Sequence, residues 1–150
     1  MIVYRLSRKR YAEDLSGRGA ELAGGRWNSK GTALVYTGQN ISLCMVEVAV
    51  HLPLGIVPKD YELISIEIPD DEIQELETYK FDWQSALTLS ITKELGDEFA
   101  KKSEKLVLKV PSAVVQGEFN YLINPKHPKI KKVKIKKIEA FGFDDRLFLR

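Results

Sequence analysis

Short apolar runs predict strands at three places along the chain, residues 2–6, 33–38 and 105–110. In the segment 61–68, apolar and polar residues alternate, which places three isoleucines on one side of a strand, Ile64, Ile66 and Ile68. The stretch 118–143 is also rich in strand-forming residues. Strands are therefore expected in the first, middle and last parts of the chain.

Two segments between these strands have the spacing of helices. The first covers about residues 41–52, follows Asn40 and Ser42 as candidate caps, and carries apolar residues at helical spacing, Leu43, Val46 and Val50. It stops before Pro53, because a proline disfavours helix in the residue that precedes it. The second covers about residues 86–102, with Gly96 as a weak point near its middle.

Helices do not follow every strand, so the pattern favours an α+β fold over a doubly wound parallel sheet. The 150 residues, 44% of them hydrophobic, suffice for one sizeable core, and no repeat or linker divides the chain. We expect one compact domain over residues 1–150, with mixed or antiparallel sheets and a few helices.

Charge and cysteine content narrow the possible classes of protein. The net charge is +2, but residues 53–100 hold three basic and twelve acidic residues, whereas residues 101–150 hold thirteen and five. A single cysteine excludes an internal disulfide and the paired spacing of zinc ribbons, so no metal site is expected.

No stretch approaches the roughly 20 apolar residues of a membrane span, and the first residues lack a signal sequence. We expect a soluble, cytoplasmic protein.

Glu47 is the acidic residue of the apolar stretch ISLCMVEVAVHL, residues 41–52. A buried carboxylate is costly without a partner, and carboxylates with perturbed pKa values in clefts are candidates for catalysis. The alternative is that Glu47 shares a solvated stripe with His51, one helical turn later.

The segment AGGRWNSKG, residues 23–31, puts Arg26 and Trp27 in a glycine-rich loop. A guanidinium suits a diphosphate or a carboxylate, and Gly25 lets a ligand approach the backbone. The segment matches neither a P-loop nor a dinucleotide-binding fingerprint. The alternative is a turn whose tryptophan covers the edge of the core.

Two hydroxyl-bearing residues are further candidates. Tyr36 can pack in the core or present its ring to a planar heterocycle. Ser112 has no nucleophile elbow around it, so we interpret it as a ligand-binding hydroxyl at the end of a strand.

Lysines crowd the segment 126–137, with Val133 and Ile135 between them. On an edge strand, lysines oppose aggregation between sheets, and we favour this interpretation. Nucleic-acid binding is the alternative, but no aromatic residues for base stacking are interleaved.

These segments occur in the order found in a known family. GRGAELAGGRWNSKGTALVYTGQNISLCMVEVAVHL, then LVLKVPSAVVQGEFNYLINPKHP and the terminal FGFDDRLF, resemble the RES domain family, named for an arginine, a glutamate and a serine. By position in these motifs, the three residues are Arg26, Glu47 and Ser112. The resemblance implies a fold similar to that of ADP-ribosyltransferases, and Tyr36 matches a position that faces the nicotinamide.

The resemblance also implies a function. RES proteins are typically bacterial toxins paired with an Xre-type antitoxin, and they consume NAD by hydrolysis or phosphorolysis of the nicotinamide–ribose bond. This chemistry suits the residues, because a ribose cation akin to that of glycosidases needs a negative charge beside it. We expect Glu47 and Arg26 to be catalytic, and the substrate-binding set to be Arg26, Tyr36, Ser112, Gly25 and Asn28.

Several alternatives remain open at this stage. NAD is expected as substrate, with inorganic phosphate as a candidate co-substrate and no tightly bound cofactor. The protein could instead transfer ADP-ribose to a protein target, and a basic nucleic-acid-binding module is the third hypothesis. The expected partner is the antitoxin, whereas membranes and nucleic acid are not expected partners; self-association is open.

Overall fold

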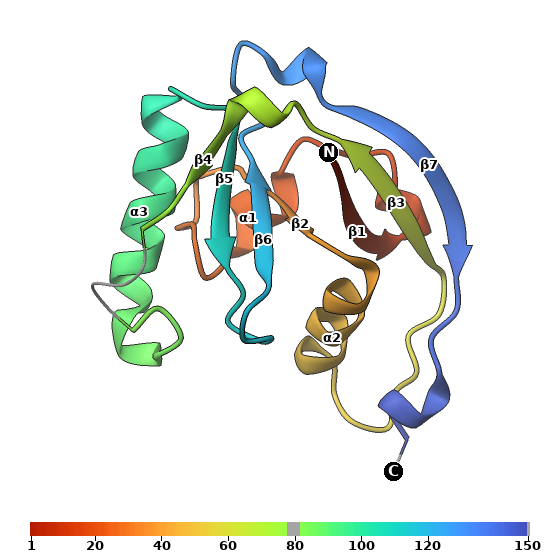
Figure 1. Cartoon of the computed structure of the whole chain (residues 1–150). Helices are drawn as coiled ribbons and strands as arrows, with labels where there is room; N and C mark the ends of the chain where they lie inside the picture. Colours follow the sequence, from red (N-terminus) through yellow and green to blue (C-terminus); the bar gives the residue numbers. More distant parts are fainter. Residues whose placement is uncertain (78–81, 150) are drawn as a thin grey trace.

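One sheet organises the molecule in the computed structural model, which describes residues 1–77 and 82–149 (Figure 1). Its strands lie in the order β4-β5-β6-β2-β1-β3-β7. Neighbouring strands pair antiparallel, apart from the parallel pair β4 and β5. The strands are β1 (Ile2–Arg8), β2 (Val35–Gly38), β3 (Tyr61–Glu67), β4 (Ile73–Glu75), β5 (Val107–Pro111), β6 (Phe119–Ile123) and β7 (Lys134–Phe141).

The described helices are α1 (Arg18–Ala23), α2 (Ile41–His51) and α3 (Leu89–Lys102). Asn40 caps α2, because its Oδ1 accepts a hydrogen bond of 2.7 Å from the amide of Leu43. The helix ends before Leu52, whose backbone is extended ahead of Pro53. Short 3-10 turns cover five further segments, Lys9–Tyr11, Asp70–Glu72, Ala86–Thr88, Ile130–Lys132 and Asp145–Leu147.

Both faces of the central strands are buried. Side chains alternate along each strand, and a separate cluster of apolar residues packs on each face. Val107 of β5 belongs to a cluster with β1 and β3, whereas the next residue, Leu108, packs with α3 on the other face. The first cluster includes the three isoleucines of the predicted alternation, all at most 1% exposed, Ile64, Ile66 and Ile68. This confirms which side of β3 faces the core.

Helix α3 covers the β4–β5 end of the sheet (Figure 1) and packs against the loop that follows α1. Gly96 lies at this contact: a Cβ there would lie 1.6 Å from the carbonyl oxygen of Trp27. The glycine that looked like a weak point in the sequence is therefore a position of close approach between the helix and the loop.

The structure confirms the α+β fold class and corrects several element boundaries. The predicted strand 2–6 continues to Arg8, and the helix expected over 86–102 begins as a 3-10 turn and becomes an α-helix at Leu89. The pattern did not predict α1 or β4, which are only six and three residues long. Elements this short contain too few positions for a periodicity to show.

The lysine-rich segment ends in β7, which forms one edge of the sheet (Figure 1). Its lysines are exposed while Ile135 and Ile138 are half-buried, which agrees with the interpretation as a protected edge strand. In the described ranges, no helix combines the length and the apolar character that a membrane span requires.

Candidate active site

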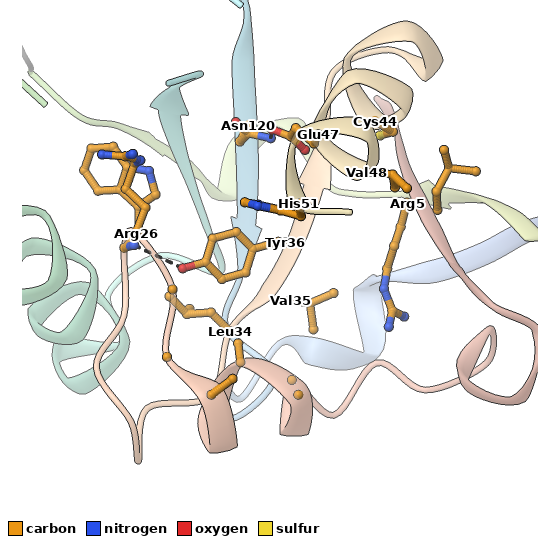
Figure 2. A pocket seen from close by; sticks show the side chains of 18 of the residues that line it. Arg5, Arg26, Leu34, Val35, Tyr36, Cys44, Glu47, Val48, His51 and Asn120 are labelled. Carbon is orange, nitrogen blue, oxygen red and sulfur yellow. Dashed lines mark hydrogen bonds between the residues drawn. The ribbon is translucent and has the colours of Figure 1, made fainter. Parts of the chain in front are cut away.

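A cleft of about 970 Å³ opens between α2, the loop after α1 and the strands β1 and β2. Figure 2 shows its wall: Glu47, Val48 and His51 come from α2, Tyr36 from β2 and Asn120 from β6. The glycine-rich loop contributes Gly24, Gly25 and Arg26. The topology thus brings segments far apart in the sequence to one concave surface, as in most small-molecule sites.

Glu47 lies on the face of α2 that borders the cleft (Figure 2). Burial raises the pKa of its carboxyl, and a 2.7 Å hydrogen bond from Asn120 Nδ2 to Oε1 partly offsets that effect by favouring the ionised form. Asn120 is itself 7% exposed and also donates to the carbonyl oxygen of Thr37. The carboxylate is therefore held in a fixed position, which favours the cleft over the solvated stripe.

Arg26 is half-buried and reaches the cleft from the glycine-rich loop. Its Nη1 donates a hydrogen bond of 2.9 Å to the carbonyl oxygen of Trp83. A guanidinium has five N–H donors in a planar fork, so one bond to the main chain fixes its direction and leaves others for a ligand.

Tyr36 presents its ring to the cleft while its hydroxyl is held by the loop (Figure 2). The hydroxyl donates to Asn28 Oδ1 at 2.6 Å and accepts from the amide of Trp27 at 3.1 Å. Burial raises the pKa of this phenol well above its ordinary value, so the hydroxyl stays protonated and keeps its bond to Asn28. The aromatic face is left for a planar group.

Gly25 borders the same ring. A Cβ at this position would lie 2.7 Å from the Tyr36 hydroxyl oxygen and 2.9 Å from Asn28 Oδ1, so any larger residue would push the loop away from the tyrosine. The glycine therefore keeps the Arg26 loop and the Tyr36 ring in contact.

Two of the predicted site residues direct their polar groups elsewhere. Asn28 is fully buried, and its Nδ2 donates to three carbonyl oxygens, those of Ala20, Ser29 and Thr32. The hydroxyl of Ser112, 2% exposed, accepts from the amides of Val114 and Val115. Neither residue is among the described residues that line the cleft. Asn28 braces the loop, and Ser112 shapes the turn that brings Ala113 and Val114 to the cleft.

Trp27 is 2% exposed and packs with Leu34, Phe99 and Leu108. Its indole lies in the core between the sheet and α3, in agreement with a bracing role next to Arg26.

The cleft also contains groups that the sequence did not single out. Among the described lining residues, four are cationic, Arg5, Arg18, Arg26 and Lys93, against the carboxylates of Asp14 and Glu47. This excess of positive charge suits an anionic ligand. Asn120 was also missed, although a polar residue inside the apolar strand FNYLI was a usable signal.

In the described part of the chain, no three residues among His, Cys, Asp and Glu gather in a way that could hold a metal ion. The described residues of the cleft offer a half-buried carboxylate at Glu47, a cationic wall and an aromatic face.

Comparison with known proteins gives results that agree with one another. The family model described as the RES domain matches residues 2–144. The protein named Toxin Res from Photorhabdus laumondii is 38% identical over 98% of this chain and 97% of its own length. The protein named Prs ADP-ribosylating toxin from Sphingobium sp. is 36% identical over 91% of this chain and 88% of its own length.

A solved structure shares the fold. The matching chain belongs to the crystal structure of the M. tuberculosis MbcT–MbcA toxin–antitoxin complex, with a TM-score of 0.69 and 21% identity. The match covers 94% of this chain and 84% of the other.

Proposed function

The chain belongs to the RES domain family of toxins, and we propose that it consumes NAD by breaking the bond between nicotinamide and ribose. Nicotinamide leaves as a neutral base with the bonding electron pair, and the ribose carbon develops positive charge. Water or inorganic phosphate then attacks that carbon, and a protein side chain as acceptor would give ADP-ribosyl transfer instead. No metal or bound cofactor is needed for any of these steps.

Glu47 is the catalytic group in this proposal. Its carboxylate would stabilise the cationic ribose and orient the attacking water or phosphate as a hydrogen-bond acceptor. A glycosidic bond that breaks through an oxocarbenium-like transition state calls for a carboxylate in this role. Asn120 would keep the carboxylate aimed at the ribose.

Arg26 and Tyr36 would bind the rest of the substrate. The free donors of the Arg26 guanidinium match the oxygen atoms of a diphosphate, and the Tyr36 ring offers a face to the nicotinamide. The other cations of the cleft would add to the attraction for the dianionic diphosphate.

The single observation that carries this proposal is the position of Glu47. The carboxylate is half-buried, is bonded to Asn120 and borders the same cleft as Arg26 and Tyr36. A purely structural glutamate in an apolar helix would be expected to pair with a cation, whereas Glu47 accepts its hydrogen bond from the neutral amide of Asn120.

The test is release of free nicotinamide from NAD by the purified protein, with and without inorganic phosphate. Glu47→Gln keeps the shape and removes the charge, so we expect release to fall by about 100-fold or more. Glu98→Gln is the matched control, because Glu98 is an exposed residue of α3 that does not line the cleft, and its rate should equal that of the wild type. An inactive wild type, or full activity of Glu47→Gln, would refute the proposal.

ADP-ribosyl transfer to a protein is the second candidate function, favoured by the relative named Prs ADP-ribosylating toxin. The two candidates share the first step and differ in the acceptor. Incubation of a lysate with labelled NAD separates them, because transfer leaves the label on protein and hydrolysis or phosphorolysis leaves it on a small molecule.

We also propose an antitoxin of the Xre type as the physiological partner. The support is the family itself and the structural neighbour, which was solved together with its antitoxin. Suppression of nicotinamide release by the co-purified antitoxin would be the direct test.

A further inference from the structure

One face of α3 contacts the loop that carries Arg26 at three successive points. The Thr92 hydroxyl donates to the carbonyl oxygen of Arg26 at 2.5 Å, and Gly96 leaves room for the carbonyl of Trp27. Asp97 accepts from the amide of Ser29 at 2.9 Å. Thr92 and Gly96 are four positions apart and therefore lie on one face of the helix. Asp97 is the next residue after Gly96, so the three contacts together form a single clamp on the loop.

Thr92 stands out among these residues because it is fully buried and lies within α3. A buried threonine in a helix usually bonds back to its own helix, and the Thr92 hydroxyl does lie 3.1 Å from the carbonyl of Leu89. Its shorter bond is to Arg26, in a segment 66 residues away in the chain. The hydroxyl has one proton, and the shorter distance indicates that this proton is donated mainly to the carbonyl oxygen of Arg26 in the loop.

The guanidinium of the same arginine is tied to the segment that leads into α3. Arg26 Nη1 donates to the carbonyl of Trp83, and the turn around Trp83 is closed by the Thr88 hydroxyl, which donates to the carbonyl of Asp82. Both ends of Arg26, its peptide and its side chain, are thus held by two residues of this region, Thr92 and Trp83.

We propose that Thr92 is a positioning residue for Arg26, acting through the Arg26 carbonyl to keep the guanidinium directed at the diphosphate of a bound nucleotide. This inference rests on the proposed function in assigning the diphosphate to Arg26. Thr92 is buried beneath the loop and outside the set of described residues that line the cleft, so it acts on the ligand through Arg26.

The experiment measures the affinity for ADP-ribose by titration calorimetry, since this probe carries the diphosphate and requires no turnover. Thr92→Val keeps the shape and removes the donor, and it should weaken binding by about 3- to 10-fold. Thr92→Ser keeps the hydroxyl and should bind within about twofold of the wild type. The control Asn124→Ala removes the bond that holds the other end of α3, at Ala100, and should lower thermal stability while leaving affinity unchanged.

A double-mutant cycle with Arg26→Ala separates positioning from general stability. If Thr92 acts through the guanidinium, Thr92→Val causes no further loss of affinity once Arg26 is alanine. Equal losses in both backgrounds, or unchanged affinity in a folded Thr92→Val protein, would overturn the proposal. Because binding is read without catalysis, a wild type that binds ADP-ribose but releases no nicotinamide refutes the proposed reaction alone. A wild type that releases nicotinamide but does not bind ADP-ribose overturns the assignment of the diphosphate to Arg26, and with it the positioning role of Thr92, while the proposed reaction stands.

Discussion

At the scale of single residues, some of the polar side chains line the cleft, whereas others form hydrogen bonds with nearby main chain. A carboxylate in an apolar helix is chemically conspicuous, so Glu47 could be singled out from the sequence as a candidate, and in the structure it lines the same cleft as Arg26 and Tyr36. Asn28 and Ser112 could not be separated from them, because asparagine and serine bond to nearby main chain as readily as to a ligand. Their direction depends on turns that only the folded chain defines.

The raised pKa of Glu47 has a consequence for stability. Below its ordinary pKa of 4.5 the protonated carboxyl favours the folded state, and that contribution is lost as the pH rises through the higher folded value. Glutamine is neutral at every pH. We therefore expect Glu47→Gln to melt at a higher temperature than the wild type near pH 7, with the difference vanishing below about pH 4.5.

Thermal melts of both proteins by circular dichroism across this pH range test the prediction. Glu98→Gln again serves as the control, because the pKa of Glu98 is lowered by Lys102, so loss of its charge should not raise stability at pH 7. A melting temperature of Glu47→Gln below that of the wild type at pH 7 would argue against a burial cost at this site.

At the scale of elements, the longer segments follow the pattern of the sequence and the shorter ones do not. Helix α2 and strand β3 were placed within one residue. For the helix, the cap, the periodicity and the flanking proline agreed, and for the strand the alternation of apolar and polar residues was clear. The function of Gly96 could not be predicted from the pattern, since glycine in a helix looks the same whether it weakens the helix or admits a neighbour.

Gly96→Ala should therefore destabilise the protein, although alanine is the better helix former. The new methyl group meets the Trp27 carbonyl, so α3 must move away from the loop, and overpacking of this kind costs about 1 to 3 kcal/mol or more. Gly19→Ala in α1 meets nothing within 4 Å and should instead stabilise the fold by roughly 0.5 to 1 kcal/mol. Denaturant unfolding measures the change in the free energy of unfolding for each variant. Changes of the same sign and size in the two variants would contradict the packing explanation.

At the scale of the whole molecule, the opposite charges of the two halves of the sequence fold into one sheet. The lysine-rich strand β7 pairs with the acidic strand β3, and Lys136 lies 3.9 Å from Glu67 across that pair. The charge asymmetry of the sequence thus partly cancels in the fold, which weakens the case for a nucleic-acid surface. The pairing of β7 with β3 could not be predicted from composition, because a long stretch of sequence separates the two strands.

Replacement of Lys134 and Lys136 by threonine should make the exposed edge of β7 a template for self-association. Size-exclusion chromatography with light scattering should show higher oligomers at concentrations where the wild type does not form them. Threonine at Lys131 and Lys132 removes the same charge from the adjacent 3-10 turn and should leave the oligomeric state unchanged. Identical behaviour of the two double variants would mean that net charge, and not the strand edge, controls association.

The two tryptophans of the chain both lie at Arg26: Trp27 is its neighbour in the loop, and the Trp83 carbonyl accepts from its guanidinium. A ligand that binds that guanidinium therefore binds next to both tryptophan residues. The protein thus carries an intrinsic optical probe at its candidate site, and ligand titrations can be followed by ultraviolet emission without a label.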